Sequence, residues 1–200
     1  MGVTKPLSGR TSESPRPCGI WHDQRGASVV EFALLVPGLI LMYIGTAELG
    51  NVLTANRRVE TVASTAADLT AQVKKVSNAD LADIVAASTS ILTPYNTTPL
   101  KVVLSSVVAD KDNITKVDWS YSSSGSGRAV GSPYTLPTGT TVAYSSVIVA
   151  EVTYAFKPML DPCAIVETET TADPCFSPGA FNLQRTFYAR PRRSLTVAKN

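Results

Sequence analysis

The apolar residues of this chain are concentrated first in one run, from Ala27 to Ala47, which follows a polar N-terminal stretch. These 21 residues contain a single charged side chain, Glu31. At about 1.5 Å rise per residue, a helix of this length covers roughly 30 Å, the thickness of the hydrocarbon core of a bilayer. The pattern therefore predicts a membrane-spanning helix over residues 27–47.

Beyond the span, apolar residues continue at helical spacing. They are separated mainly by steps of three and four residues, and charged side chains occupy the other positions. This spacing predicts an amphipathic helical stem over residues 48–92. We expect one helix, unbroken over 28–76, followed by a short second helix that has Asn78 as its N-cap and ends near Leu92.

The pattern changes from helical spacing to strand alternation at Leu100, after two prolines, Pro94 and Pro99. Valine-rich and alternating stretches predict strands over 101–109, 115–121, 141–156 and 183–190, joined by a Ser/Gly/Pro/Thr-rich exposed loop or hairpin between the second and third. In the second strand, Val117, Trp119 and Tyr121 are expected on one face. Residues 93–200 are thus predicted to form a strand-rich domain. The fold class is α+β, with a long N-terminal helix packed on an antiparallel sheet.

Residues 1–26 show no hydrophobic periodicity and contain three prolines, so we expect a disordered leader. This leader holds four Lys or Arg side chains against two acids, while positive and negative charges balance in the rest of the chain. Positive charge before a first span keeps that side in the cytoplasm, which places the strand-rich domain outside the inner membrane. The even balance elsewhere implies no basic face for nucleic acid.

Three interpretations of the apolar run compete. A secretory signal peptide would be cleaved after Ala47, but its apolar core is usually shorter than this run. A permanent anchor fits the length and gives no reason for Glu31, because an acid within a span is costly unless it has a function. A prepilin-type signal accounts for Gly26, Glu31 and the long helix together. Within the run, Pro37 removes a backbone donor, so a kink or a loosened turn is expected there.

Gly26 stands at the border between the basic leader and the apolar run, with Glu31 five residues later and Phe32 after it. This arrangement resembles the processing site of prepilins. More closely, the sequence from Arg25 to Leu34 with Pro37, followed by Gly-Thr-Ala-Glu-Leu-Gly over 45–50, resembles the N-terminal signature of the TadE/TadG-like proteins of tight-adherence pilus systems.

The resemblance implies a minor pilin or pseudopilin that is processed by a membrane prepilin peptidase and assembles with other pilin subunits. Cleavage would fall between Gly26 and Ala27. The new amine of Ala27 and the Glu31 carboxylate of a neighbouring subunit would attract each other strongly in a low dielectric, with Phe32 beside them. The chain departs from the major pilins of such systems, which are very short and resemble a Glu-Tyr pattern. It is therefore not expected to be the main filament subunit.

Cys163 and Cys175 are the cysteines that follow the span, and each stands in an Asp-Pro-Cys context. In an oxidising compartment this pair predicts a disulfide, which contributes roughly 2–3 kcal/mol through loop entropy. Metal binding would need further ligands, and the single histidine, His22, lies in the leader. No metal or cofactor is expected.

The sequence gives no support for catalysis, because the histidine is on the other side of the predicted span from the strand-rich domain. We therefore expect a structural or assembly protein rather than an enzyme. The alternative is a permanently anchored periplasmic protein that binds a ligand or senses the envelope. A deep polar pocket in the strand-rich domain would favour that alternative.

Overall fold

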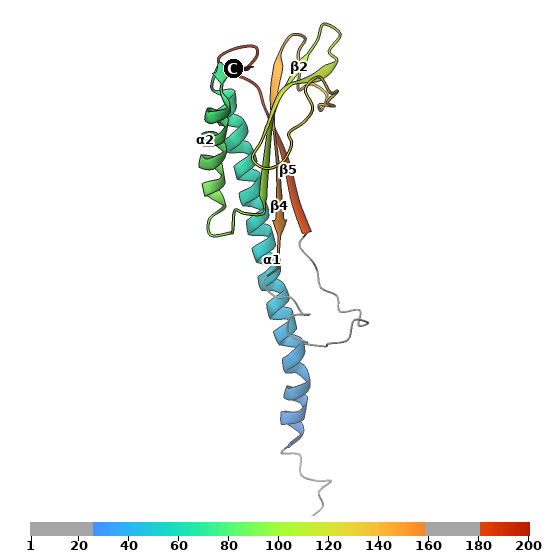
Figure 1. The fold of residues 1–200 in the computed structure, drawn as a ribbon. Coiled ribbons are helices and arrows are strands. Elements are labelled where there is room, and N and C mark those ends of the chain that lie inside the picture. Colours follow the sequence, from blue (N-terminus) through green and yellow to red (C-terminus); the bar gives the residue numbers. More distant parts are fainter. Residues whose placement is uncertain (1–25, 159–180) are drawn as a thin grey trace, which may run out of the picture. The chain divides into compact units, whose positions relative to one another are not determined.

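A computed structural model describes residues 26–158 and 181–200. The chain divides into two compact units, Met1–Ile44 and Gly45–Asn200. The fold is α+β, as predicted, with a long N-terminal helix that packs through its later residues on an antiparallel sheet (Figure 1). The elements are α1 (Ala27–Ala71), β1 (Lys75–Val76), α2 (Asn78–Thr89), the 3-10 helix η3 (Ser90–Leu92), β2 (Leu100–Ala109), β3 (Thr115–Ser122), β4 (Ser146–Phe156), β5 (Phe181–Ala189) and β6 (Ala198–Lys199).

The first helix ends at Ala71, so the prediction that it continues to Val76 is wrong. Val76 is buried, but it belongs to the short strand β1, which pairs in parallel with β6. The amide of Arg192 donates to the carbonyl of Ala71 at 3.0 Å, and the amide of Ala198 donates to that of Lys74 at 3.1 Å. These distant partners satisfy carbonyls that another helical turn would have used, so the backbone leaves the helix here.

The second helix begins with a capping box centred on Ser77 rather than on Asn78, which corrects the predicted N-cap. The Ser77 amide donates to Asp80 at 2.9 Å, and the Asp80 amide donates to the Ser77 hydroxyl at 3.2 Å. Two otherwise unpaired donors are thereby satisfied reciprocally. The hydrogen bond from the Ser77 backbone lowers the pKa of the exposed Asp80 carboxyl below its ordinary value.

Four strands form an antiparallel sheet in the order β3-β2-β4-β5. Its strands lie close to the predicted ranges, except that β4 starts at Ser146 and not at residue 141. Residues 142–145 turn instead. The Val142 amide donates to the Ser145 hydroxyl at 3.1 Å, and Tyr144 has a φ of 64° that a strand does not allow. The last main strand, β5, begins at Phe181, two residues before the predicted start.

The main core lies between the sheet and the later part of α1. Small side chains dominate the buried stripe of the helix, which is Ala55, Val59, Val62, Ala63, Ala66, Ala67 and Ala71. Their spacing of mainly three and four residues puts them on one face. Larger residues of the sheet, such as Leu104, Ile148 and Tyr154, belong to the same core cluster, and α2 contributes Leu81 to it. Alanine lets the helix backbone approach the sheet closely while the larger strand residues fill the space.

A bulge in β3 separates two residues that the alternating pattern had placed together. Ser106 pairs with Trp119, but the next residue, Val107, pairs with Val117, so Asp118 is extra in the ladder. Trp119 therefore packs in the main core, whereas Val117 packs on the opposite face of the sheet. The prediction of one shared face is thus wrong for Val117. The Trp119 indole N–H donates to the carbonyl of Val197 at 2.7 Å, which the shifted register makes possible.

The segment between β3 and β4 is a loop, as predicted, but it is held against the outer face of the sheet. The Arg128 guanidinium binds both carboxylate oxygens of Glu151, at 2.8 and 2.6 Å, and lies 4.7 Å from the centre of the Tyr134 ring. The hydrogen bond that Arg128 donates to the Glu151 carboxylate raises the pKa of Arg128, and burial raises the pKa of Tyr134. This clamp covers a small second core that includes Val117.

Two adjacent buried serines of β2 provide a test of this packing. The Ser105 hydroxyl bonds with that of Ser120 at 2.9 Å, whereas the Ser106 hydroxyl has no hydrogen-bond partner among the described residues. We predict that Ser105→Ala destabilises the protein by about 1 kcal/mol, while Ser106→Ala leaves its stability unchanged or raised. Thermal unfolding of the full chain in detergent measures both. Equal losses would contradict the assigned hydrogen bonds.

Candidate membrane-spanning and assembly helix

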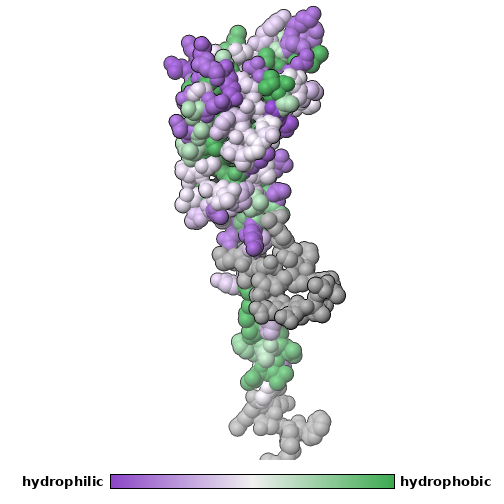
Figure 2. Space-filling view, in the orientation of Figure 1, coloured by the Kyte–Doolittle hydropathy of each residue, from purple (hydrophilic) through white to green (hydrophobic). Residues whose placement is uncertain are grey.

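The first half of α1 is apolar on every side. Ile40, Leu41, Met42 and Tyr43 are consecutive and each is more than half exposed. Since successive helical residues are rotated by about 100°, these four alone point in all directions. The helix offers a candidate membrane span by its length and composition, and Figure 2 shows the exposed apolar surface of this segment. A helix that is apolar all round needs an apolar environment.

The second half of α1 has a different character, because its apolar residues are one-sided. Leu53 is still 52% exposed, but Ala55 is fully buried, and the buried stripe then continues to Ala71. A water-facing side alternates with this stripe and carries charged residues such as Arg57 and Glu60. The same helix is therefore suited to two environments, an apolar one before residue 47 and a protein core after Ala55.

Gly26 immediately precedes the helix and is exposed. A side chain at this position would meet no atom within 4 Å, so the fold of the described residues does not require a glycine here. The helix begins at the next residue, Ala27.

Glu31 lies in the second turn of the helix, four residues after Ala27 and hence on the same side. Its side chain is exposed, and no described residue makes an ion pair with it. Phe32 is the next residue and is 64% exposed. Helical spacing thus puts positions 27 and 31 on one side of the helix, where the Glu31 side chain and the neighbouring Phe32 ring are both exposed.

Pro37 lies inside α1, which continues through it to Ala71. Its missing N–H leaves one helical carbonyl in the preceding turn without its usual donor. Gly38 follows, and a side chain there would also meet nothing within 4 Å. The kink or loosened turn expected at Pro37 stays a prediction.

Comparison with family models gives one match, to a model described as TadE-like protein, over residues 26–68. The chain carries a TadE-like segment. This confirms the resemblance seen in the sequence, and the segment fits a protein associated with Tad pili. Comparison with curated proteins and with solved structures gives no match. The TadE-like segment begins at Gly26 and covers the exposed apolar half of α1 together with most of its buried half.

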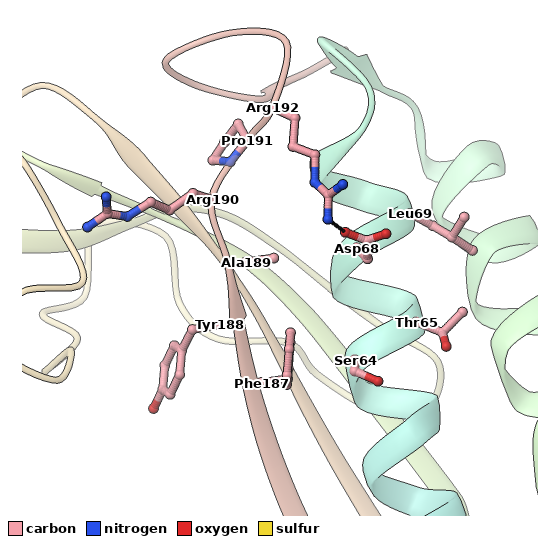
Figure 3. A pocket seen from close by; sticks show the side chains of 10 residues that line it. All are labelled: Ser64, Thr65, Asp68, Leu69, Phe187, Tyr188, Ala189, Arg190, Pro191 and Arg192. Carbon is pink, nitrogen blue, oxygen red and sulfur yellow. Dashed lines mark hydrogen bonds and ion pairs between the residues drawn. The ribbon is translucent and has the colours of Figure 1, made fainter.

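The TadE-like segment ends at Asp68, which forms an ion pair with Arg192 at 2.6 Å. Next to this pair, a cavity of about 710 Å³ separates α1 from β5 (Figure 3). It is lined by Ser64, Thr65, Asp68 and Leu69 of α1 and by residues 187–192. Sequence reasoning missed this feature, because nothing local to either stretch indicates that the two lie together.

The predicted site residues have different outcomes. Gly26, Ala27, Glu31 and Phe32 lie together at the start of the TadE-like segment, and their roles in cleavage and assembly stay predictions. The predicted disulfide between Cys163 and Cys175 lies outside the described residues, as does most of the leader. The apolar half of α1 is a candidate span that fits a membrane-anchored pilus protein.

Two equally exposed leucines of α1 test where the apolar environment ends. Leu39 is 57% exposed and lies within the candidate span over residues 27–47, whereas Leu53 is 52% exposed and lies beyond it. An aspartate near the centre of a span costs about 2.5–3.5 kcal/mol of insertion free energy. We expect Leu39→Asp to lower the fraction of protein that resists alkaline extraction from membranes, and Leu53→Asp to leave it unchanged. The same result for both variants would contradict the assigned span.

Proposed function

We propose that this protein is a minor pilin or pseudopilin of a Tad pilus system, a structural subunit without catalytic activity. One observation carries the proposal. The TadE-like segment includes the half of α1 that is apolar on all sides, and this half bears an exposed acid, Glu31, near its start. A plain anchor needs the apolar surface but not the acid, whereas a subunit that packs against others within a membrane can use both.

In this proposal the helix over residues 27–47 spans the inner membrane and the domain from residue 48 onward lies on the periplasmic or extracellular side. The basic leader supports this direction, since positive charge before a span stays in the cytoplasm. The proposed partners are a prepilin peptidase, which cleaves after Gly26, and other pilin subunits, which receive the processed helix.

The attraction proposed for assembly acts between opposite charges in a setting with little water. Cleavage gives Ala27 a positive amine, and Glu31 lies on the same side of the helix one turn later. The Glu31 carboxylate is exposed and makes no ion pair with a described residue, so it can meet the amine of a neighbouring subunit. Such a contact also fixes the axial position of one helix relative to the next. Charge-assisted bonds of this kind are roughly twice as strong as neutral ones.

The alternative of an anchored ligand-binding protein depends on a deep polar pocket in the strand-rich domain. The cavity beside Asp68 lies instead between α1 and the sheet edge, and two of its lining residues are Phe187 and Leu69. Its position and mixed lining suit contact with another polypeptide better than enclosure of a polar ligand. The structural role is therefore the function that we favour.

The first test of the proposal is the start of the mature chain. We predict that it begins at Ala27, and that Gly26→Leu blocks processing, because a peptidase pocket shaped for glycine excludes a larger side chain. Gly45→Leu is the matched control, since a side chain at either glycine meets nothing within 4 Å. The intact mass of the membrane-extracted protein shows at which residue the mature chain begins.

The control also separates the competing interpretations. Cleavage after Ala47 by a secretory signal peptidase requires a small residue at position 45, so Gly45→Leu would then be the variant that stays unprocessed. A mature chain that begins at Met1 or Glu48 would overturn the prepilin interpretation.

The second test concerns Glu31. We predict that Glu31→Ala is expressed and inserted, because removing an acid from a span eases insertion. Its loss should nevertheless reduce recovery of other pilin subunits by about tenfold, the effect of ~1.4 kcal/mol per contact. Co-purification from membranes and the yield of pili measure this outcome. Glu60→Ala removes another exposed acid of α1, beyond the span, and should have no effect. Normal piliation with Glu31→Ala would refute the proposed assembly role.

A further inference from the structure

The two edges of the sheet differ in whether their outward-pointing amides and carbonyls have hydrogen-bond partners among the described residues. At the β3 edge, the loop that follows the strand supplies partners. The Gly131 amide donates to the Val117 carbonyl at 2.7 Å, the Val117 amide donates to Ser132 at 3.0 Å, and the Tyr134 amide donates to Thr115 at 3.1 Å. The chain therefore covers this edge itself, which is how proteins prevent unwanted strand pairing.

The β5 edge has no such cover among the described residues. The amide of Ala155 donates to Pro99 beside β2, while that of Ser146 donates to Leu195 on the other side. Backbone groups of the even-numbered residues of β4 thus point toward β5, because direction alternates along an antiparallel strand. Their partners on β5 are the odd-numbered residues from Phe181 to Ala189.

The even-numbered residues of β5, from Asn182 to Tyr188, consequently direct their amides and carbonyls away from the sheet. Among these groups, only the Gln184 carbonyl has a described partner, the guanidinium of Arg185 at 3.3 Å. Residues 182–188 therefore offer a free ladder of donors and acceptors to an incoming strand.

A cavity accompanies this free edge on the side that faces α1. Figure 3 shows Phe187 and Ala189 on the α1 side of β5, with Tyr188 and Arg190 on the other. Across the cavity, α1 presents the short side chains of Ser64 and Thr65, and Phe187 remains 39% exposed. An added strand would insert every second side chain here, where apolar residues can cover Phe187.

The positive charge of the C-terminal residues indicates what kind of strand would pair with the β5 edge. Residues 181–200 contain four arginines and one lysine but no acid. Arg190 binds the carbonyls of Gly139 and Thr140, and Arg192 binds Asp68. Among the described residues, the partner of the Arg185 guanidinium is the Gln184 carbonyl alone. The register of β5 with β4 puts Arg185 on the α1 side, between Leu183 and Phe187. An acid opposite Arg185 would give this cation a charged partner.

We infer that the β5 edge binds an extended segment of another polypeptide as a fifth strand of the sheet. The segment presents one acidic residue opposite Arg185, with apolar residues two positions before and after it that lie against Leu183 and Phe187. Its backbone pairs with residues 182–188. This surface is distinct from the span and from Glu31, and the inference does not depend on the proposed pilin role.

A second copy of this chain fits the edge poorly. Antiparallel pairing of two β5 strands about Arg185 would put the two guanidinium groups directly opposite each other, which is destabilising. A shift of the register by one pair removes this clash but sets each Arg185 against Leu183 or Phe187. Neither arrangement gives the cation an acidic partner, so a different polypeptide is the favoured occupant.

Short synthetic peptides test the inference on the full chain in detergent micelles. The probe is a fluorescently labelled Thr-Val-Thr-Glu-Thr-Val-Thr, whose symmetry suits either strand direction, and the control is Thr-Val-Thr-Lys-Thr-Val-Thr. We expect the Glu peptide to bind at least about tenfold more tightly by fluorescence anisotropy. Arg185→Glu should reverse this preference while leaving processing at Gly26 unchanged.

A second variant tests the backbone ladder independently of charge. Thr186→Pro removes an amide that points off the edge, so pairing of β5 with β4 is retained. We expect it to weaken binding of the Glu peptide about tenfold, with the circular dichroism spectrum unchanged. Equal affinity for both peptides, an unchanged preference in Arg185→Glu, or self-association through β5 in ultracentrifugation would each overturn the inference.

Discussion

The central constraint on this molecule is that one helix must satisfy two different environments. Before residue 47, α1 exposes large apolar side chains on all sides, and after Ala55 it buries a narrow stripe of alanine and valine against a sheet. A helix that is apolar on all sides can face an apolar environment in any rotation about its own axis. A helix with one alanine stripe can pack on the sheet in only one rotation. The packing of this stripe therefore fixes how residues 55–71 are rotated against the sheet.

The features that follow from local patterns could be predicted from the sequence. Length and hydropathy predicted the long apolar helix that is a candidate span, and alternation predicted the four main strands to within a few residues at most ends. The errors occurred where a distant partner decides the local structure. Hydrogen bonds from Arg192 and β6 stop α1 before the predicted end, and a bulge at Asp118 puts Val117 on the opposite face of the sheet. The cap at Ser77 is different, because its signal was local: an acid three residues later completes a capping box.

The candidate site also combines features that a local pattern predicts with features that depend on distant parts of the chain. Gly26, Glu31 and Phe32 could be proposed from the sequence because they lie within a few residues of each other, at the start of a helix whose periodicity is known. The cavity beside Asp68 was not found, because its walls come from α1 and β5, which are far apart in the chain. The open edge of β5 depends on which neighbour each strand has, and the alternation that identifies a strand contains no information about its place in the sheet.

The parallel pairing of β1 with β6 has a consequence for the time course of synthesis. The carbonyl of Ala71 receives its hydrogen bond from Arg192, and Lys74 and Val76 receive theirs from Ala198 and Asn200. At roughly 5–20 residues per second, a ribosome needs on the order of 10 s to make the intervening chain. During that interval α1 is complete but its sheet is not, so the alanine stripe has no partner. A chaperone that protects nascent chains would have its main opportunity to act on this protein then.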